Sequence, residues 1–226
     1  MADTGLERAL VALENVLRRT GARHMLIGGV AVIAHGVRRL TDDVDVALWA
    51  EGIDLAGLVE RLSRAKIEPR IENAVAFAKR THVLLLRHRP SGIDIDLSLS
   101  FLPFEDAALD HATPRDLGRA RIPVARPADL VVYKAIAARE RDRSDIERLL
   151  EMHGDAIDLS AMRRRVEELG AALDRPEILI DLDRIIARLG LEIARPGTTR
   201  GTPSRRKKAG RARKKKTLGK KKAGRR

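Results

Sequence analysis

The chain has 226 residues, no cysteine, one tryptophan, one tyrosine, three phenylalanines and a net charge of +13. Its length suits one domain with an appendage, and the lack of thiols excludes disulfides, thiolate catalysis and cysteine-ligated metal sites. The longest apolar run, residues 25–34, is far shorter than the roughly 20 residues of a membrane span, and the first residues do not resemble a signal peptide. We therefore expect a cytoplasmic protein with no membrane segment.

The first 125 residues alternate between helix and strand patterns. Apolar residues at helical spacing predict the helices, whereas period-two alternation or a short apolar run predicts the strands. The predicted elements, in chain order, are a helix over residues 6–17, a strand over 24–27, a helix over 30–34, a strand over 43–48, a helix over 55–65, strands over 75–78, 82–86 and 93–99, and a short helix between Pro103 and Pro114.

The pattern becomes purely helical from Pro127 onward. Helices are predicted over residues 128–139, 143–152, 159–169 and 176–189, with Gly154, Gly170 and Gly190 as stops. We therefore expect the α+β class in three parts: an α+β core of mixed sheet and flanking helices over residues 1–125, a helical portion over 126–192 and a tail over 193–226.

The end of the chain carries the whole basic excess. Fifteen of the 45 Lys and Arg residues lie within residues 197–226, which contain no Asp or Glu. This segment has one leucine and no aromatic residue, so it cannot bury a core and is expected to be disordered. A flexible polycation binds nucleic-acid phosphates without reading their sequence, so RNA or another nucleic acid is the expected partner. A solubilising role and an acidic partner are the alternatives.

Two aspartates on one predicted strand are the first candidates for chemistry. Asp43 and Asp45 project from the same face, because residues two apart in a strand point the same way. Neighbouring carboxylates raise each other's pKa unless a cation lies between them, and their hard oxygen atoms suit Mg²⁺ or Mn²⁺. A solvated face of a surface strand is the ordinary alternative.

The pair Gly28-Gly29 supplies the complementary half of a nucleotide site. It falls between a predicted strand and a predicted helix, where unpaired backbone N–H groups favour an anion. Without side chains, the backbone lets a triphosphate approach closely. A lone Gly-Gly is usually a turn, but together with the two aspartates it favours a joint nucleotide and metal site.

A second acidic strand follows at residues 93–97. Asp94 and Asp96 face one way and the apolar residues the other, so a third acidic ligand is available if this strand lies beside the first. We favour Asp96 over Asp94 because the buried alternation continues after it in Leu97 and Leu99. An amphipathic edge strand is the alternative.

These motifs resemble the nucleotidyltransferase superfamily that includes DNA polymerase beta. Its signature appears as Ile27-Gly28-Gly29, then thirteen residues, then Asp43-Val44-Asp45-Val46, with a third acid on a later strand. The stretch GGVAVIAHGVRRLTDDVDV is similar to the nucleotidyltransferase-like toxins of bacterial abortive-infection toxin–antitoxin systems, as are LPFEDAALDHA and ADLVVYKAIAARERDRSDIERLL. The resemblance covers about residues 5–190 and departs from the superfamily's commoner Gly-Ser at Gly29, which removes a hydroxyl contact to phosphate.

The resemblance implies a nucleotidyltransferase-type fold and a metal-dependent nucleotidyl transfer. An acceptor hydroxyl, on RNA such as tRNA or on a protein, would attack the α-phosphate of a nucleoside triphosphate and release pyrophosphate. Asp43 and Asp45 would bridge the metal ions, while Asp96 or Asp94 would hold the ion that activates the acceptor. Gly28 and Gly29 would hold the β- and γ-phosphates, and an antitoxin would be a further partner.

The resemblance also assigns weaker candidates outside the two acidic strands. Arg39 and Thr41 would either orient the triphosphate or lock the loop before the first acidic strand, and Lys134 matches a lysine that matters in the toxin group. Asp142 and Asp145 match its acidic residue. Lys134 snorkelling from an amphipathic helix, and ordinary ion pairs on the helix surface for the two acids, are the alternatives.

Two other functions stay open. One is a catalytically silent module that keeps the fold and binds nucleic acid through residues 197–226. The other is a small-molecule nucleotidyltransferase such as an antibiotic-modifying enzyme. Zinc hydrolases, P-loop enzymes and serine hydrolases are not favoured, because the chain has no His-x-x-x-His pair, Gly-x-x-x-x-Gly-Lys-Ser/Thr loop or Gly-x-Ser-x-Gly elbow.

Overall fold

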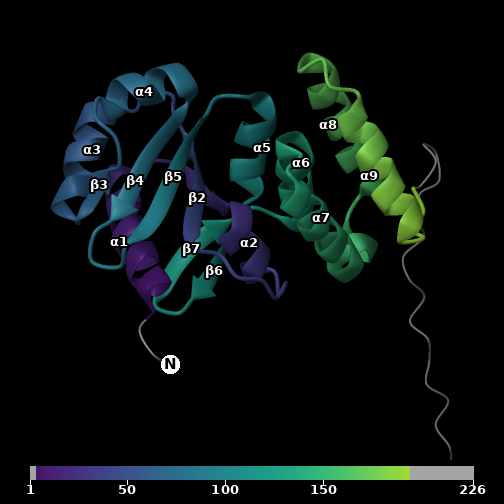
Figure 1. The fold of residues 1–226 in the computed structure, drawn as a ribbon, viewed down its shortest axis with the longest axis horizontal. Helices are drawn as coiled ribbons and strands as arrows, with labels where there is room; N and C mark the ends of the chain where they lie inside the picture. The colour runs from purple at the N-terminus through teal and green to yellow at the C-terminus, as the bar shows by residue number, and fades with distance from the viewer. Residues whose placement is uncertain (1–3, 194–226) are drawn as a thin grey trace, which may run out of the picture. The chain divides into compact units, whose positions relative to one another are not determined.

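The computed structural model describes residues 4–193, so the predicted basic tail lies outside the described residues. Within that range, helices flank a seven-stranded mixed sheet with the strand order β3-β4-β5-β2-β1-β7-β6 (Figure 1). The expected α+β class is confirmed. The elements are α1 (Gly5–Thr20), β1 (His24–Ile27), α2 (Gly28–Ala34), β2 (Asp43–Trp49), α3 (Leu55–Arg64), β3 (Ile67–Pro69), α4 (Ala74–Thr81), β4 (Val83–His88), β5 (Ile93–Ser100), α5 (Pro103–His111), β6 (Thr113–Leu117), β7 (Ala120–Val124), α6 (Pro127–Ala137), α7 (Glu140–His153), the 3-10 turn η1 (Gly154–Ala156), α8 (Leu159–Ala172) and α9 (Glu177–Arg188).

Two pairings at the centre of the sheet position the acidic residues. β2 pairs in parallel with β5, so that Asp43 lies opposite Asp94 and Asp45 opposite Asp96. On its other side β2 pairs antiparallel with β1, which places Ile27 opposite Asp45. The expectation that the two aspartate-bearing strands are neighbours is therefore confirmed.

The alternation within β2 fixes this register. Val44 and Val46 are completely buried, whereas Asp43 and Asp45 on the opposite face are only partly buried. A shift of one residue would turn the carboxylates into the apolar core and the valines out of it, so the hydrophobic pattern specifies which residues pair.

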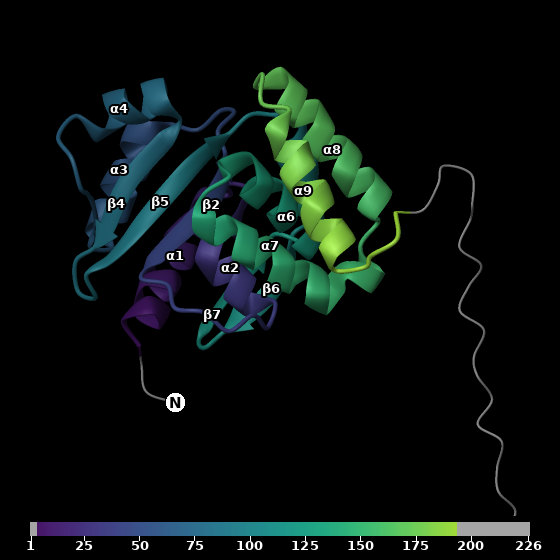
Figure 2. The same ribbon diagram turned by 45° about the vertical axis from the view of Figure 1, so that its right-hand side comes forward.

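α6 is the central helix of the second half. It packs against α2, α7, α8 and α9, and Figure 2 shows α7 and α9 lying in front of it. Just before α6 begins, the Ala125 N–H donates to the Leu26 carbonyl at 3.0 Å. The helical portion is thus joined to the sheet at the end of β1, next to Gly28.

The strand predicted over residues 75–78 is wrong, because these residues lie in α4. Ala74 and Ala78 are both buried and stand four positions apart, which is the spacing of one helix face. Val75 and Phe77 are strand-prone residues, but packing of the small alanines overrides that preference.

Three strands were not predicted at all. β3 has only three residues and therefore shows no measurable alternation. In the β6–β7 hairpin, β6 has four exposed residues out of five and contains Pro114, so it carries no apolar pattern. β3 and β6 lie at the two edges of the sheet, where backbone hydrogen bonds to one neighbour hold them. β7 lies inside the sheet and buries Ala120, Ile122 and Val124 in alternation, but it contains Pro123, which disfavours a strand assignment.

Candidate active site

The junction of β1 and α2 brings the glycine pair against β2. Gly28 has a φ of +64°, and a Cβ there would lie 1.8 Å from Asp45 Oδ2. A Cβ on Gly29 would lie 2.5 Å from Thr41 Oγ1 and 3.1 Å from Arg39 Nη2. The positive φ and the contact with Asp45 favour glycine at position 28, whereas a side chain at position 29 would have to displace Thr41 and Arg39.

Three carboxylates gather beside this junction. The pKa of Asp45 is raised to about 6, chiefly by burial and then by the charges of Asp43 and Asp96, while Lys134 and the Gly29 backbone N–H oppose the shift. Burial likewise raises the pKa of Asp96, with Arg70 opposing it and the charge of Asp43 adding to it. The arrangement therefore concentrates negative charge that the protein only partly compensates.

Thr41 and Arg39 line the approach to β2. The Thr41 hydroxyl donates to Asp43 Oδ1 at 2.5 Å, which orients that carboxylate. The Arg39 Nη1 donates to Asp145 Oδ2, also at 2.5 Å. The loop between α2 and β2 is thus tied both to the carboxylates and to α7.

The candidates on the helical half form one buried cluster. Lys134 Nζ lies 2.8 Å from Asp142 Oδ1 and 2.8 Å from Asp145 Oδ2. Their residue exposures are only 8%, 3% and 3% respectively, which excludes the snorkelling lysine and the helix-surface ion pairs. Asp142 also accepts from the Arg139 backbone N–H at 3.2 Å, so it caps the start of α7.

The acids of β5 are held by arginines that sequence reasoning missed. Arg70 donates to Asp94 at 2.8 Å and also to Asp96, and Arg87 donates to Asp94 from Nε at 2.6 Å. The Arg87 hydrogen bond lowers the pKa of Asp94. No motif points to Arg70, which is an isolated arginine 26 positions before Asp96 in the sequence.

The structure thus brings most of the predicted residues together, although not as a ready metal cage. Within residues 4–193, no three or more His, Asp or Glu side chains are arranged to hold a metal ion. Asp94 points to its two arginines, and Asp142 joins the group only through Lys134. The residues that meet at the ends of β1 and β2 are Gly28, Gly29, Arg39, Thr41, Asp43, Asp45, Asp96, Lys134 and Asp145.

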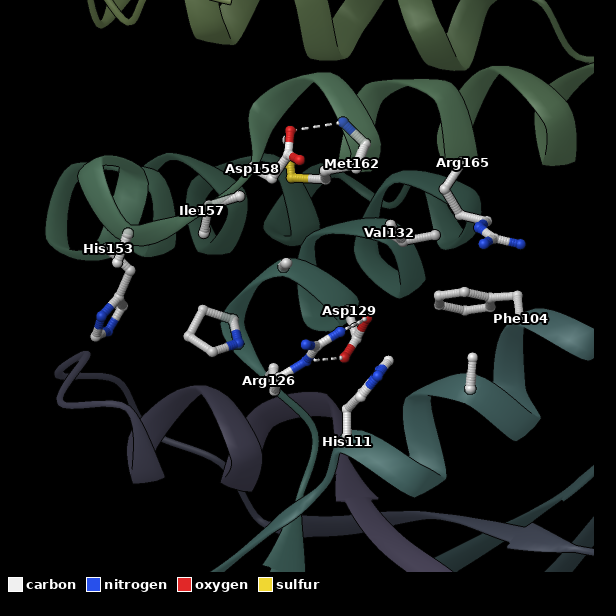
Figure 3. Close-up of a pocket in the computed structure, with 15 residues that line it drawn as sticks. Phe104, His111, Arg126, Asp129, Val132, His153, Ile157, Asp158, Met162 and Arg165 are labelled. Atoms are coloured by element: carbon white, nitrogen blue, oxygen red, sulfur yellow. Dashed lines mark hydrogen bonds and ion pairs between the residues drawn. The ribbon is translucent and has the colours of Figure 1, made fainter. Parts of the chain in front are cut away.

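A cavity of about 480 Å³ lies apart from these residues. Figure 3 shows Phe104, Val132 and Met162 around it, with Arg126 paired to Asp129 at its floor. None of the predicted site residues lines it. Val132 faces this cavity, and Lys134, two residues later on α6, is turned about 200° away around the helix axis.

The helices in residues 4–193 include none with the length and apolar character needed to cross a membrane.

A family model described as "Nucleotidyl transferase of unknown function (DUF2204)" matches residues 6–182. No curated protein matches the chain.

Three solved structures are similar to this chain at low sequence identity. The antibiotic-resistance factor ANT(2'')-Ia is 14% identical, with 81% of this chain and 98% of that chain covered and a TM-score of 0.50. An antigenic nucleotidyltransferase-like protein from Paracoccidioides brasiliensis is 18% identical, covering 78% and 91%, with a TM-score of 0.47. The lincomycin-bound lincosamide antibiotic adenylyltransferase LnuA is 15% identical, covering 65% and 97%, with a TM-score of 0.45. The likeness to ANT(2'')-Ia supports the nucleotidyltransferase-type fold.

Proposed function

This chain belongs to the nucleotidyl transferase family of unknown function, and we propose that it transfers a nucleoside monophosphate from a nucleoside triphosphate to an acceptor hydroxyl with the help of Mg²⁺ or Mn²⁺. The proposal depends on one observation, the register that sets Asp45 beside both Gly28 and Asp96. That register joins a glycine-lined approach for phosphates to a group of carboxylates.

The carboxylates fit a divalent ion. Burial, followed by the charges of Asp43 and Asp96, raises the pKa of Asp45 to about 6, and a cation between Asp43 and Asp45 would relieve the repulsive part of this shift. Mg²⁺ is commonly held by one or two carboxylates plus substrate phosphates, so a cage of three protein ligands is not required. When bound, the ion would neutralise charge on the triphosphate and polarise the α-phosphate.

The chain's own groups supply the rest of the transfer. Asp96 accepts the proton of the acceptor hydroxyl, whose oxygen bonds to the α-phosphorus as the bond to the β-phosphate oxygen breaks and pyrophosphate leaves. The raised pKa of Asp96 makes this carboxylate a stronger base. Arg39, beside Gly29, and Lys134, whose charge acts on Asp45, would face the triphosphate.

For the acceptor we favour RNA, with tRNA as the leading candidate, over a protein side chain. The argument is the 15 positive charges of residues 197–226, which would bind RNA phosphates and raise the local concentration of acceptor. A toxin that modifies RNA and is neutralised by an antitoxin protein is consistent with this chemistry. An antibiotic acceptor has no such feature in its favour.

Asp45→Asn tests the proposal. We expect the wild-type chain, given α-³²P-labelled NTPs, Mg²⁺ and total RNA, to move label into RNA. The variant should lose at least about 100-fold in rate, because losing metal-centred stabilisation of several kcal/mol costs tenfold per 1.36 kcal/mol. Asp116→Asn, at an exposed carboxylate paired with Arg121, is the matched control. Equal rates for Asp45→Asn and wild type would contradict the assignment.

The second candidate is a catalytically silent module that binds nucleic acid. The contact between Arg70 and Asp96 favours this silent module, because one of the predicted catalytic carboxylates is already paired with an arginine. The two functions differ in nucleotide binding: the silent module binds RNA without any Mg²⁺-dependent affinity for NTPs.

A further inference from the structure

Arg70 is fixed in position by the sheet. Its backbone N–H donates to the Leu85 carbonyl at 3.0 Å, and Leu85 lies opposite Asp96 in the pairing of β4 with β5. From this anchor the side chain reaches across β4, and its Nη1 and Nη2 donate to Asp94 and Asp96 respectively. The guanidinium therefore bridges both acids of β5.

The two acids differ in the cations that contact them. Asp94 is bound by Arg87 as well as by Arg70. For Asp96, Arg70 is the one side chain within residues 4–193 that donates to it, and the bond goes to Oδ1. Oδ2 of Asp96 has no hydrogen-bond partner in the same part of the chain, so this oxygen is available to an acceptor hydroxyl.

A guanidinium at this position has the properties of a built-in cation. It keeps its charge at all relevant pH values, and its planar fork matches carboxylate oxygens. Arg70 Nε is buried and has no hydrogen-bond partner among residues 4–193. The two ion pairs hold the side chain in place despite the free-energy cost of this unsatisfied donor. A divalent ion approaching Asp96 would meet this positive charge at close range.

We propose that the Arg70 guanidinium takes the place of a second divalent ion at Asp96, so that the nucleotide-bound site holds a single such ion between Asp43 and Asp45. This inference rests on the proposed nucleotidyl transfer. Arg70 acts as a positioning residue: it orients Asp96 and counters the repulsion from Asp43, while Asp96 Oδ2 receives the acceptor proton.

The number of bound ions tests the proposal without any turnover. Full-length protein is dialysed against Mn²⁺ and an α,β-methylene NTP analogue, and the ratio of bound Mn²⁺ to bound nucleotide is measured. We expect a ratio of one for the wild type and of two for Arg70→Gln, which frees Asp96 for an ion. Arg87→Gln is the matched control, because it removes a partner of Asp94 alone, and its ratio should stay at one.

Asp96→Asn provides a second, independent measurement. Its ratio should remain one, because in the wild type Asp96 holds Arg70 and no ion. This variant decides the question alone if circular dichroism shows that Arg70→Gln does not fold. A ratio of two for the wild type, a lower ratio for Asp96→Asn, or a ratio of one for folded Arg70→Gln overturns the proposal. No nucleotide-dependent Mn²⁺ on the wild type overturns the proposed function and this inference with it.

Discussion

Asp45 makes the stability of the metal-free protein depend on pH. Its pKa is raised from 3.8 to about 6 in the folded state, so the folded chain binds this proton more tightly than the unfolded chain. The resulting stabilisation is complete below pH 3.8 and is lost as the pH rises through about 6. At 1.36 kcal/mol per unit, the loss is at most about 3 kcal/mol.

Asp45→Asn removes this titration. In EDTA we expect the variant to exceed the wild type in free energy of unfolding at pH 8 by up to about 3 kcal/mol, and the gap to close towards pH 4. Urea denaturation at a series of pH values measures the difference, with Asp116→Asn as the exposed control. Parallel curves for Asp45→Asn and wild type would show that the carboxyl is not perturbed.

At the scale of single residues, the sequence predicts those site residues that stand out within a local sequence pattern. Asp43 and Asp45 stand out because they alternate with buried valines, and Gly28 because it follows a short apolar strand. Arg70 gives no such signal, since its contact with Asp96 depends on the pairing of β3, β4 and β5. The contact between Arg70 and Asp96 can therefore be recognised only from the three-dimensional structure.

Between elements, the buried cluster on α6 and α7 joins the helical portion to the loop before β2. Lys134 pairs with two buried aspartates, one of which also binds Arg39. We propose that this cluster is the functional contact between the core over residues 1–125 and the helical portion over residues 126–192. The contact would hold Arg39 near Gly29.

Lys134→Met should therefore destabilise the protein. Removing the ammonium leaves two buried carboxylates with too little positive charge, and breaking a buried ion pair in this way costs about 3–5 kcal/mol. Urea denaturation at pH 7 measures the loss, and Lys79→Met, at an exposed position on α4, is the control. Adding Asp142→Asn should recover part of the loss. A change below about 1 kcal/mol would mean that the cluster contributes little.

Helices and strands can be predicted from the sequence where one face of the element is buried and its apolar pattern extends over many residues. α1 and β2 show clear apolar periodicity, so their expected ranges agree closely with the structure. The predictions missed β3, which is short, β6, which is exposed, and β7, which contains a proline. They also misread α4, in which alanine packing decides the conformation. Pairing partners, rather than local pattern, define those segments.

For the whole molecule, charge divides the chain into a slightly acidic part and a basic end. The described residues 4–193 belong to one compact unit, and 15 Lys and Arg residues follow later in the sequence, within residues 197–226. We propose that nucleic-acid affinity depends on this segment and nucleotide affinity on the compact unit. The two activities should then separate in one deletion.

Deleting residues 197–226 should weaken binding to RNA and flatten its salt dependence, because each phosphate neutralised adds about 0.7–0.9 to the slope of log K against log salt. Fluorescence anisotropy at several salt concentrations measures both quantities, and Mg²⁺-dependent binding of the NTP analogue should be unchanged. A variant with the same 30 residues in scrambled order is the matched control and should keep the slope, since a polycation reads no sequence. If the deletion leaves the slope intact, the RNA contact lies on the compact unit.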